Sequence, residues 1–220
     1  MKLIPYLLLL ILLFSCDETS KKSEGKEEHI ELITAPTYNL EDTLSTFLTT
    51  ALLQDTLEQD NYDPFYFFKS GHLFTDTANH AIFIKEVEGL FVMDIWKQED
   101  NFWLNTGHID TLPSSLLSFN ISFIDFNFDG YNDIFINTSC SNGYAMIRGY
   151  LIIVDPINKS LFYHNEVADF ANFSVDSKRK IVIAEQFTEC NSSFKSPPDE
   201  VHFKWKDSLL VEVNRINKCR

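Results

Sequence analysis

Nine residues near the middle of the chain carry the ligand spacing of a calcium-binding loop. The loop has glycine at position 6 and oxygen-bearing side chains at positions 1, 3, 5 and 9, which are Asp125, Asn127, Asp129 and Asp133. Calcium loops of this kind turn sharply at the glycine and take a backbone carbonyl at position 7, here Tyr131. Three carboxylates and an amide on one turn would also repel one another without a cation. The spacing therefore predicts a structural Ca2+ ion.

This loop differs from a helical EF-hand in two ways. Its position 12 is Ile136 rather than the bidentate Glu, and both flanking segments have the composition of strands. Because Ca2+ takes six to eight oxygens, water or a remote carboxylate must complete the shell. The plainer interpretation is a polar turn in which Asp and Asn side chains cap backbone amides.

The N-terminus has the pattern of a bacterial lipoprotein signal. Lys2 precedes an uncharged stretch that ends at Phe14, and Ser15 and Cys16 follow. A stretch of about 12 apolar residues is too short to span the roughly 30 Å hydrocarbon layer as a helix. The order resembles a lipobox, which implies that Cys16 is acylated and begins the mature chain. The expected location is the bacterial cell envelope, with the periplasmic leaflet and the cell surface both open.

Polar residues dominate the segment after this cysteine, so it cannot bury an apolar face. We therefore divide the chain into a signal peptide (1–15), a lipidated cysteine with a flexible tether (16–35) and a calcium-binding β domain (36–220). The formal net charge is -14, which argues against nucleic-acid binding.

One helix is expected near the start of the domain, from Asn39 to Gln59. Apolar residues there recur with a period of 3.6, Asn39 can cap, and Glu41 and Asp42 suit the first turn. Several threonines lower the helix propensity, so tertiary contacts must hold this segment.

The rest of the chain favours short strands separated by turns. The expected strands are Phe65–Phe68, Ala81–Lys85, Leu90–Lys97, Phe102–Asn105, Ile121–Asp125, Ile134–Asn137, Tyr144–Val154, Lys180–Phe187, Val201–Lys206 and Leu209–Val213. Asp207 and Ser208 have the length of a two-residue hairpin loop. No helical pattern separates the strands, so we expect a mainly β fold, a single antiparallel β-sandwich or barrel-like domain with one N-terminal helix.

The segment from Phe123 to Ile134 resembles the strand-flanked calcium loops of FG-GAP and VCBS-type repeat proteins. It is also similar to single-domain bacterial lipoproteins that resemble invertebrate-type lysozyme inhibitors and act as immunity proteins against peptidoglycan-cutting toxins. Further segments fall in a similar order: Tyr66–Phe68, Ala81–Phe83, Trp103 and Phe203–Trp205.

This resemblance implies a protein partner and a contact loop. Such inhibitors insert a Ser-Gly-x-x-Tyr loop into the enzyme cleft, and here Ser141, Gly143 and Tyr144 occupy a comparable segment with different spacing. The implied partner is a cationic peptidoglycan-cleaving enzyme, which a chain of net charge -14 would attract. The alternative is a non-inhibitory, calcium-stabilised surface or adhesive domain.

Three cysteines remain once Cys16 is assigned to lipid. Cys140 and Cys190 both follow expected strands in Ser- and Asn-containing turns, so they are the preferred disulfide pair, and Cys219 would stay free. Motifs of common hydrolases and metalloenzymes are missing from the sequence, and the six histidines are scattered. We therefore expect no enzymatic activity.

Overall fold

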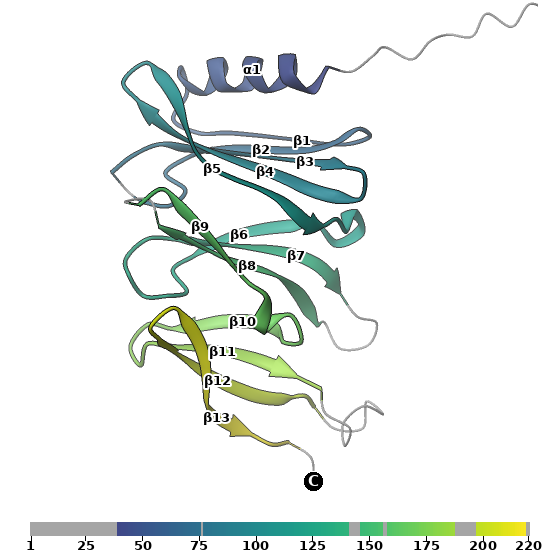
Figure 1. Ribbon diagram of the computed structural model, residues 1–220, viewed down its shortest axis with the longest axis vertical. Helices are drawn as coiled ribbons and strands as arrows, with labels where there is room; N and C mark the ends of the chain where they lie inside the picture. The colour runs from purple at the N-terminus through teal and green to yellow at the C-terminus, as the bar shows by residue number, and fades with distance from the viewer. Residues whose placement is uncertain (1–38, 76, 141–145, 156–157, 188–196, 219–220) are drawn as a thin grey trace, which may run out of the picture. The chain divides into compact units, whose positions relative to one another are not determined.

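The computed structural model describes residues 39–75, 77–140, 146–155, 158–187 and 197–218 (Figure 1). Two short 3-10 turns, Leu116–Ser118 and Asn165–Val167, and one helix, α1 (Leu40–Ala51), lie in this part of the chain. The strands are β1 (Leu57–Tyr62), β2 (Phe65–Gly71), β3 (His80–Val87), β4 (Leu90–Glu99), β5 (Phe102–Pro113), β6 (Asn120–Ile124), β7 (Asp133–Cys140), β8 (Ile147–Asp155), β9 (Ser160–His164), β10 (Ala171–Asp176), β11 (Ile181–Gln186), β12 (Asp199–Lys206) and β13 (Leu209–Ile216).

The strands form three antiparallel sheets, each a meander of consecutive strands. The first sheet contains β1 to β5, the second β6 to β9 and the third β10 to β13. Figure 1 shows them following one another in chain order. The expected mainly β, antiparallel fold with one N-terminal helix is confirmed. The described strands form three open sheets, so they make one sheet more than a two-sheet sandwich and do not close into a barrel.

Three hydrophobic clusters hold these layers together. The first and second sheets share a cluster that includes Phe91, Ile134 and Ile136. The opposite face of the second sheet packs on the third through a cluster that includes Phe135 and Phe203. A third cluster joins α1 to the outer face of the first sheet. The second sheet therefore buries residues on both of its faces, which is why its two central strands contain the continuous apolar runs Ile134–Ile136 and Leu151–Val154.

Helix α1 begins where the sequence predicts. The side chain of Asn39 accepts a hydrogen bond from the Glu41 backbone N–H at 3.1 Å. The apolar stripe, which includes Phe47, packs on the first sheet as the periodicity requires. Four threonine hydroxyls donate back to the carbonyl four residues earlier, a bond that competes with the helix ladder: Thr43, Thr46, Thr49 and Thr50.

The predicted C-terminal end of this helix is wrong. The helix ends at Ala51, and Leu57–Tyr62 form β1 instead. This segment pairs with β2 along its whole length, from Leu57 opposite Ser70 to Tyr62 opposite Phe65. A ladder to a buried neighbouring strand thus outweighs the weak helical tendency of a polar segment.

Ten of the described strands match the predicted ones, with ends shifted by up to three residues in nine of them. The exception is β5, which was predicted to end at Asn105 and runs to Pro113. The two-residue turn at Asp207 and Ser208 between β12 and β13 is confirmed. Besides β1, the sequence prediction missed β9 and β10. Both are short edge strands: β9 lies at one edge of the second sheet and β10 at one edge of the third.

Candidate functional site

The predicted calcium loop lies between β6 and β7, as expected, and it is a tight polar turn. The carboxylate of Asp125 accepts hydrogen bonds from the backbone N–H groups of Asp129, at 3.2 Å, and Gly130, at 3.0 Å. Asn127 Oδ1 accepts from the same Asp129 N–H at 3.1 Å, and Asp129 Oδ1 accepts from the Tyr131 N–H at 2.8 Å. Three of the predicted ligand side chains are therefore brought together over one turn.

The left-handed backbone of this turn explains its glycine. Gly130 has φ +94, a region that L-residues rarely adopt, and a Cβ added there would meet open space. Strain, rather than lack of room, selects glycine at this position. The loop is also tied to the connection between β2 and β3 of the first sheet, because the Asn132 backbone N–H donates to the Phe74 carbonyl at 2.9 Å.

Asp133 differs from the other predicted ligands, since its side chain is fully buried. Its Oδ2 accepts from the backbone N–H groups of Phe126, at 2.8 Å, and Asn127, at 3.3 Å. Its Oδ1 accepts from the Val154 N–H on β8 at 3.0 Å. Burial raises the pKa of Asp133 to about 7, against the lowering effect of these N–H groups. This carboxylate therefore ties the loop to strands β7 and β8.

A groove of about 640 Å3 opens beside this loop. It lies between the loop, strand β9 and the turn from β12 to β13, and its lining includes Asn127, Phe162 and Asp207, one from each of these elements. Its volume lies within the range typical of ligand sites. Four of its lining residues carry carboxylates, which are Asp129, Asp155, Glu166 and Asp207, and none of the described lining residues is Lys or Arg. Apart from His164, the titratable acidic and basic side chains among these lining residues are therefore all acidic.

Aromatic side chains supply much of the remaining surface. The Trp205 indole N–H donates to the Phe126 carbonyl at 2.7 Å, which joins β12 to the loop. The His164 ring stands edge-on to Trp205, with ring centroids 5.1 Å apart. Phe162 and Tyr163 of β9 also line the groove, and Phe162 is 54% exposed. Rigid and exposed aromatic surface thus lies next to the carboxylates.

One carboxylate of the groove is held by its neighbour. His164 Nδ1 and Glu166 Oε1 lie 2.7 Å apart. Partial burial acts to raise the pKa of Glu166, but the hydrogen bond and charge of His164 outweigh it, so the pKa falls below its usual value. Partial burial and the charge of Glu166 raise the pKa of Tyr163. Both effects favour a charged Glu166 and a neutral Tyr163.

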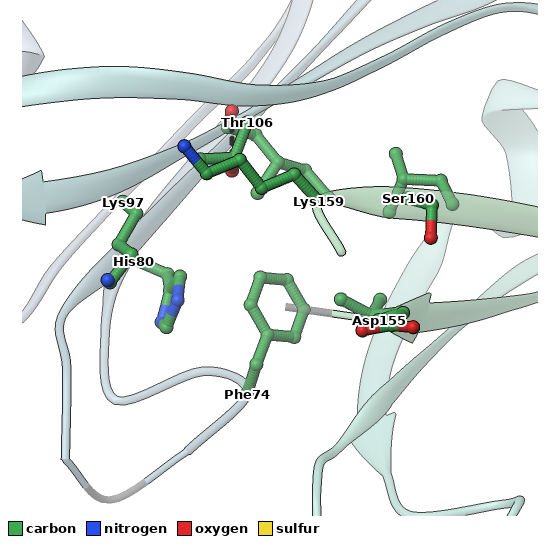
Figure 2. A pocket seen from close by; sticks show the side chains of 10 residues that line it. Phe74, His80, Lys97, Thr106, Asp155, Lys159 and Ser160 are labelled. Atoms are coloured by element: carbon green, nitrogen blue, oxygen red, sulfur yellow. Dashed lines mark hydrogen bonds between the residues drawn. The ribbon is translucent and has the colours of Figure 1, made fainter. Parts of the chain in front are cut away.

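A second, much smaller cavity of about 20 Å3 lies between the first and second sheets (Figure 2). Figure 2 shows the imidazole of His80 beside the Phe74 ring, and the two ring centroids are 5.0 Å apart. His80 is 2% exposed, and within the described residues its Nδ1 has no hydrogen-bond partner. Burial lowers the pKa of His80 to about 4. The cavity has room for about one water molecule, so it is no substrate site.

Several predicted site residues fall outside the described part of the chain. These are Cys16, Cys190 and the proposed partner loop of Ser141, Gly143 and Tyr144, while Cys140 is described as the last residue of β7 without its side chain. The lipid anchor, the disulfide and the contact loop therefore stay predictions.

Sequence reasoning missed the groove, because its lining comes from segments up to 82 residues apart, from Asn127 to Leu209, that no local pattern connects. A search of the described residues finds no cluster of three or more His, Cys, Asp and Glu side chains arranged to hold a metal ion. Within the same residues no helix has the length and apolar character needed to cross a membrane.

Comparisons with known proteins give a distant likeness of fold. No family model matches the chain, and no curated protein matches it. The fold is similar to that of a Xanthomonas type IV secretion system related protein, with 13% sequence identity and a TM-score of 0.42. The similarity covers 73% of this chain and 85% of that chain. A likeness at this level implies nothing about function.

Proposed function

We propose that this protein is a lipid-anchored protein of the bacterial envelope that binds and inhibits a cationic peptidoglycan-cleaving enzyme. It would act as a lysozyme inhibitor or immunity protein, without catalytic activity of its own. The observation that carries the proposal is the concentration of negative charge in the groove, where four carboxylates line one concave surface without a Lys or Arg. The whole chain has a formal net charge of -14.

Charge of this kind acts on encounter more than on affinity. An acidic protein attracts a cationic enzyme over several ångströms and speeds association, and salt screens the effect. Many envelope proteins are acidic without a partner, so net charge alone does not distinguish an inhibitor from a surface domain. A concave site with one sign of charge does favour a binding partner.

A structural Ca2+ ion is the second part of the proposal. The side chains of Asp125, Asn127 and Asp129 gather over one turn, and this oxygen set fits a hard cation. The Tyr131 carbonyl and Asp133 complete the set that the sequence spacing suggests. When bound, the ion would offset the mutual repulsion of the loop carboxylates and stiffen one end of the groove.

Inhibition of peptidoglycan cleavage tests the proposed function. The mature protein, titrated against representatives of several lysozyme classes, should inhibit at least one of them, and added salt should slow association. The alternative is a non-inhibitory surface or adhesive domain. If the protein inhibits no lysozyme class, the inhibitor function is refuted and that alternative is favoured.

Thermal unfolding tests the ion separately. Extracellular calcium modules bind at roughly 0.1 to 1 mM. Calcium at about 100 times its dissociation constant stabilises a protein by about 2.7 kcal/mol, which is about 8 °C in Tm for a domain of this size. Asp129→Asn should remove most of this shift relative to a chelator control. Asp100→Asn, in the turn between β4 and β5, is the matched control and should keep it.

A further inference from the structure

We propose that the groove beside the loop, formed by β9 and the β12–β13 turn, is a docking site for an arginine-bearing segment of a partner protein. This inference rests on the proposed function and names the surface that would carry it. That surface differs from the contact loop at Ser141–Tyr144 that the sequence suggests.

The carboxylates select a cationic occupant. Glu166 and Asp207 reach the groove from two separate elements outside the loop: the turn after β9 and the β12–β13 hairpin. A neutral ligand covering them would strip water from charged groups without replacing their interactions, which is unfavourable. A cationic side chain would instead form charge-assisted hydrogen bonds as the water leaves.

The aromatic surface selects arginine among the cations. Phe162 is 54% exposed and lines the groove, so its ring presents area to a ligand there. A planar guanidinium stacks on aromatic rings and donates to a carboxylate through two N–H groups at once, whereas a lysine ammonium acts as a compact, strongly hydrated charge. The combination of rings and carboxylates therefore fits arginine better than lysine.

The floor of the groove is already organised for binding. The hydrogen bond from Trp205 to the Phe126 carbonyl and the contact of His164 with Trp205 fix the rings in place. The close His164–Glu166 pair fixes one carboxylate as well. A site that is ordered before binding loses less side-chain entropy when its ligand arrives.

The test uses hexa-arginine as the probe and calorimetry on the mature protein at fixed calcium. The protein should bind hexa-arginine, bind hexa-lysine several times more weakly, and lose affinity with added salt. Asp207→Asn should weaken binding up to about fivefold, as expected for one exposed ion pair. Asp207 has φ +56, a conformation that asparagine tolerates, so this variant keeps its turn.

Asp100→Asn is the matched control. Asp100 also has a positive φ, +49, in a two-residue hairpin turn, and it does not line the groove. It should bind the probe like the parent protein. Adding Phe162→Ala to Asp207→Asn should weaken binding further. Because the Phe162 ring is 54% exposed, its removal leaves the hydrophobic clusters in place and the loss reports on the groove.

Three results would overturn the docking site: equal affinities for Asp207→Asn and Asp100→Asn, equal affinities for the two peptides, or salt-independent binding of chitotetraose in place of hexa-arginine. If the groove variants inhibit a lysozyme as strongly as the parent protein does, the docking site is refuted while the proposed function stands. Conversely, groove-dependent peptide binding without inhibition of any lysozyme would support the site and remove the inhibitor function.

Discussion

Replacing Gly149 by alanine should destabilise the protein through a clash inside the second sheet. Gly149 lies on β8 opposite Asn137 of β7. A Cβ added at this glycine would lie 2.1 Å from the Ile136 carbonyl oxygen and 2.9 Å from Phe135 Cε1. Real Cβ atoms essentially never come closer than 3.0 Å to such atoms. The strands must therefore separate by about 0.9 Å, the difference between 3.0 and 2.1 Å.

A separation of this size has two costs. It weakens about two ladder hydrogen bonds, worth about 1 kcal/mol each. It also displaces β7, which packs into two hydrophobic clusters, and overpacking of this kind costs about 1 to 3 kcal/mol. We expect a loss of about 4 kcal/mol in the free energy of unfolding, or about 12 °C in Tm for a domain of this size.

Urea unfolding of Gly149→Ala beside Gly107→Ala measures this effect. A Cβ at Gly107 would lie 2.7 Å from Leu161 Cδ1, the end of a flexible side chain that can rotate away, so this control should lose only about 1 kcal/mol. A Gly149→Ala protein within about 1 kcal/mol of the parent would refute the close approach of β7 and β8. Equal losses in the two variants would refute the distinction between backbone and side-chain clashes.

Three further predictions concern buried or bridging groups. Because the pKa of His80 falls from 6.5 to about 4, the unfolded chain binds a proton between these values that the folded chain does not. The contribution of His80 to the free energy of unfolding should therefore be fully present above pH 6.5 and fall by up to about 3 kcal/mol as the pH drops to 4. Urea titrations at several pH values should show this decline in the parent protein and lack it in His80→Gln. Trp205→Phe removes the indole bond to the Phe126 carbonyl and should cost about 1 kcal/mol, so an unchanged urea midpoint would contradict the bond. Trp103→Phe removes the 2.8 Å bond to the Leu48 carbonyl and should speed proteolysis within α1, whereas an unchanged cleavage rate would show that this bond does not hold the helix.

The sequence was sufficient for elements with a strong local pattern. Val201–Lys206 alternates and is flanked by a two-residue turn, so β12 and its hairpin were predictable. Leu57–Tyr62 contains four polar or acidic residues in succession, and only its ladder to the aromatic strand β2 makes it a strand. The number of sheets was not predictable, because an apolar strand buried on two faces has the same composition whichever sheets cover it.

The candidate site was likewise predictable only where its residues are close in the sequence. Nine consecutive residues define the loop, so its turn was visible in the ligand spacing. The buried position of Asp133 was not, since its Val154 partner lies on another strand 21 residues later. The groove depends on β9, which the sequence prediction missed, and on a hairpin about 40 residues beyond it.

The three hydrogen bonds of Asp133 have a consequence for how β7 finds its correct alignment. Ile134 and Ile136 enter one hydrophobic cluster and Phe135 enters the other, so hydrophobicity scarcely distinguishes the two faces of this strand. A slip by one residue would exchange the faces at little cost in apolar burial. It would, however, move the buried Asp133 carboxylate away from the backbone N–H groups that donate hydrogen bonds to it, which is severely unfavourable. A residue predicted as an ion ligand thus also marks where the strand must start.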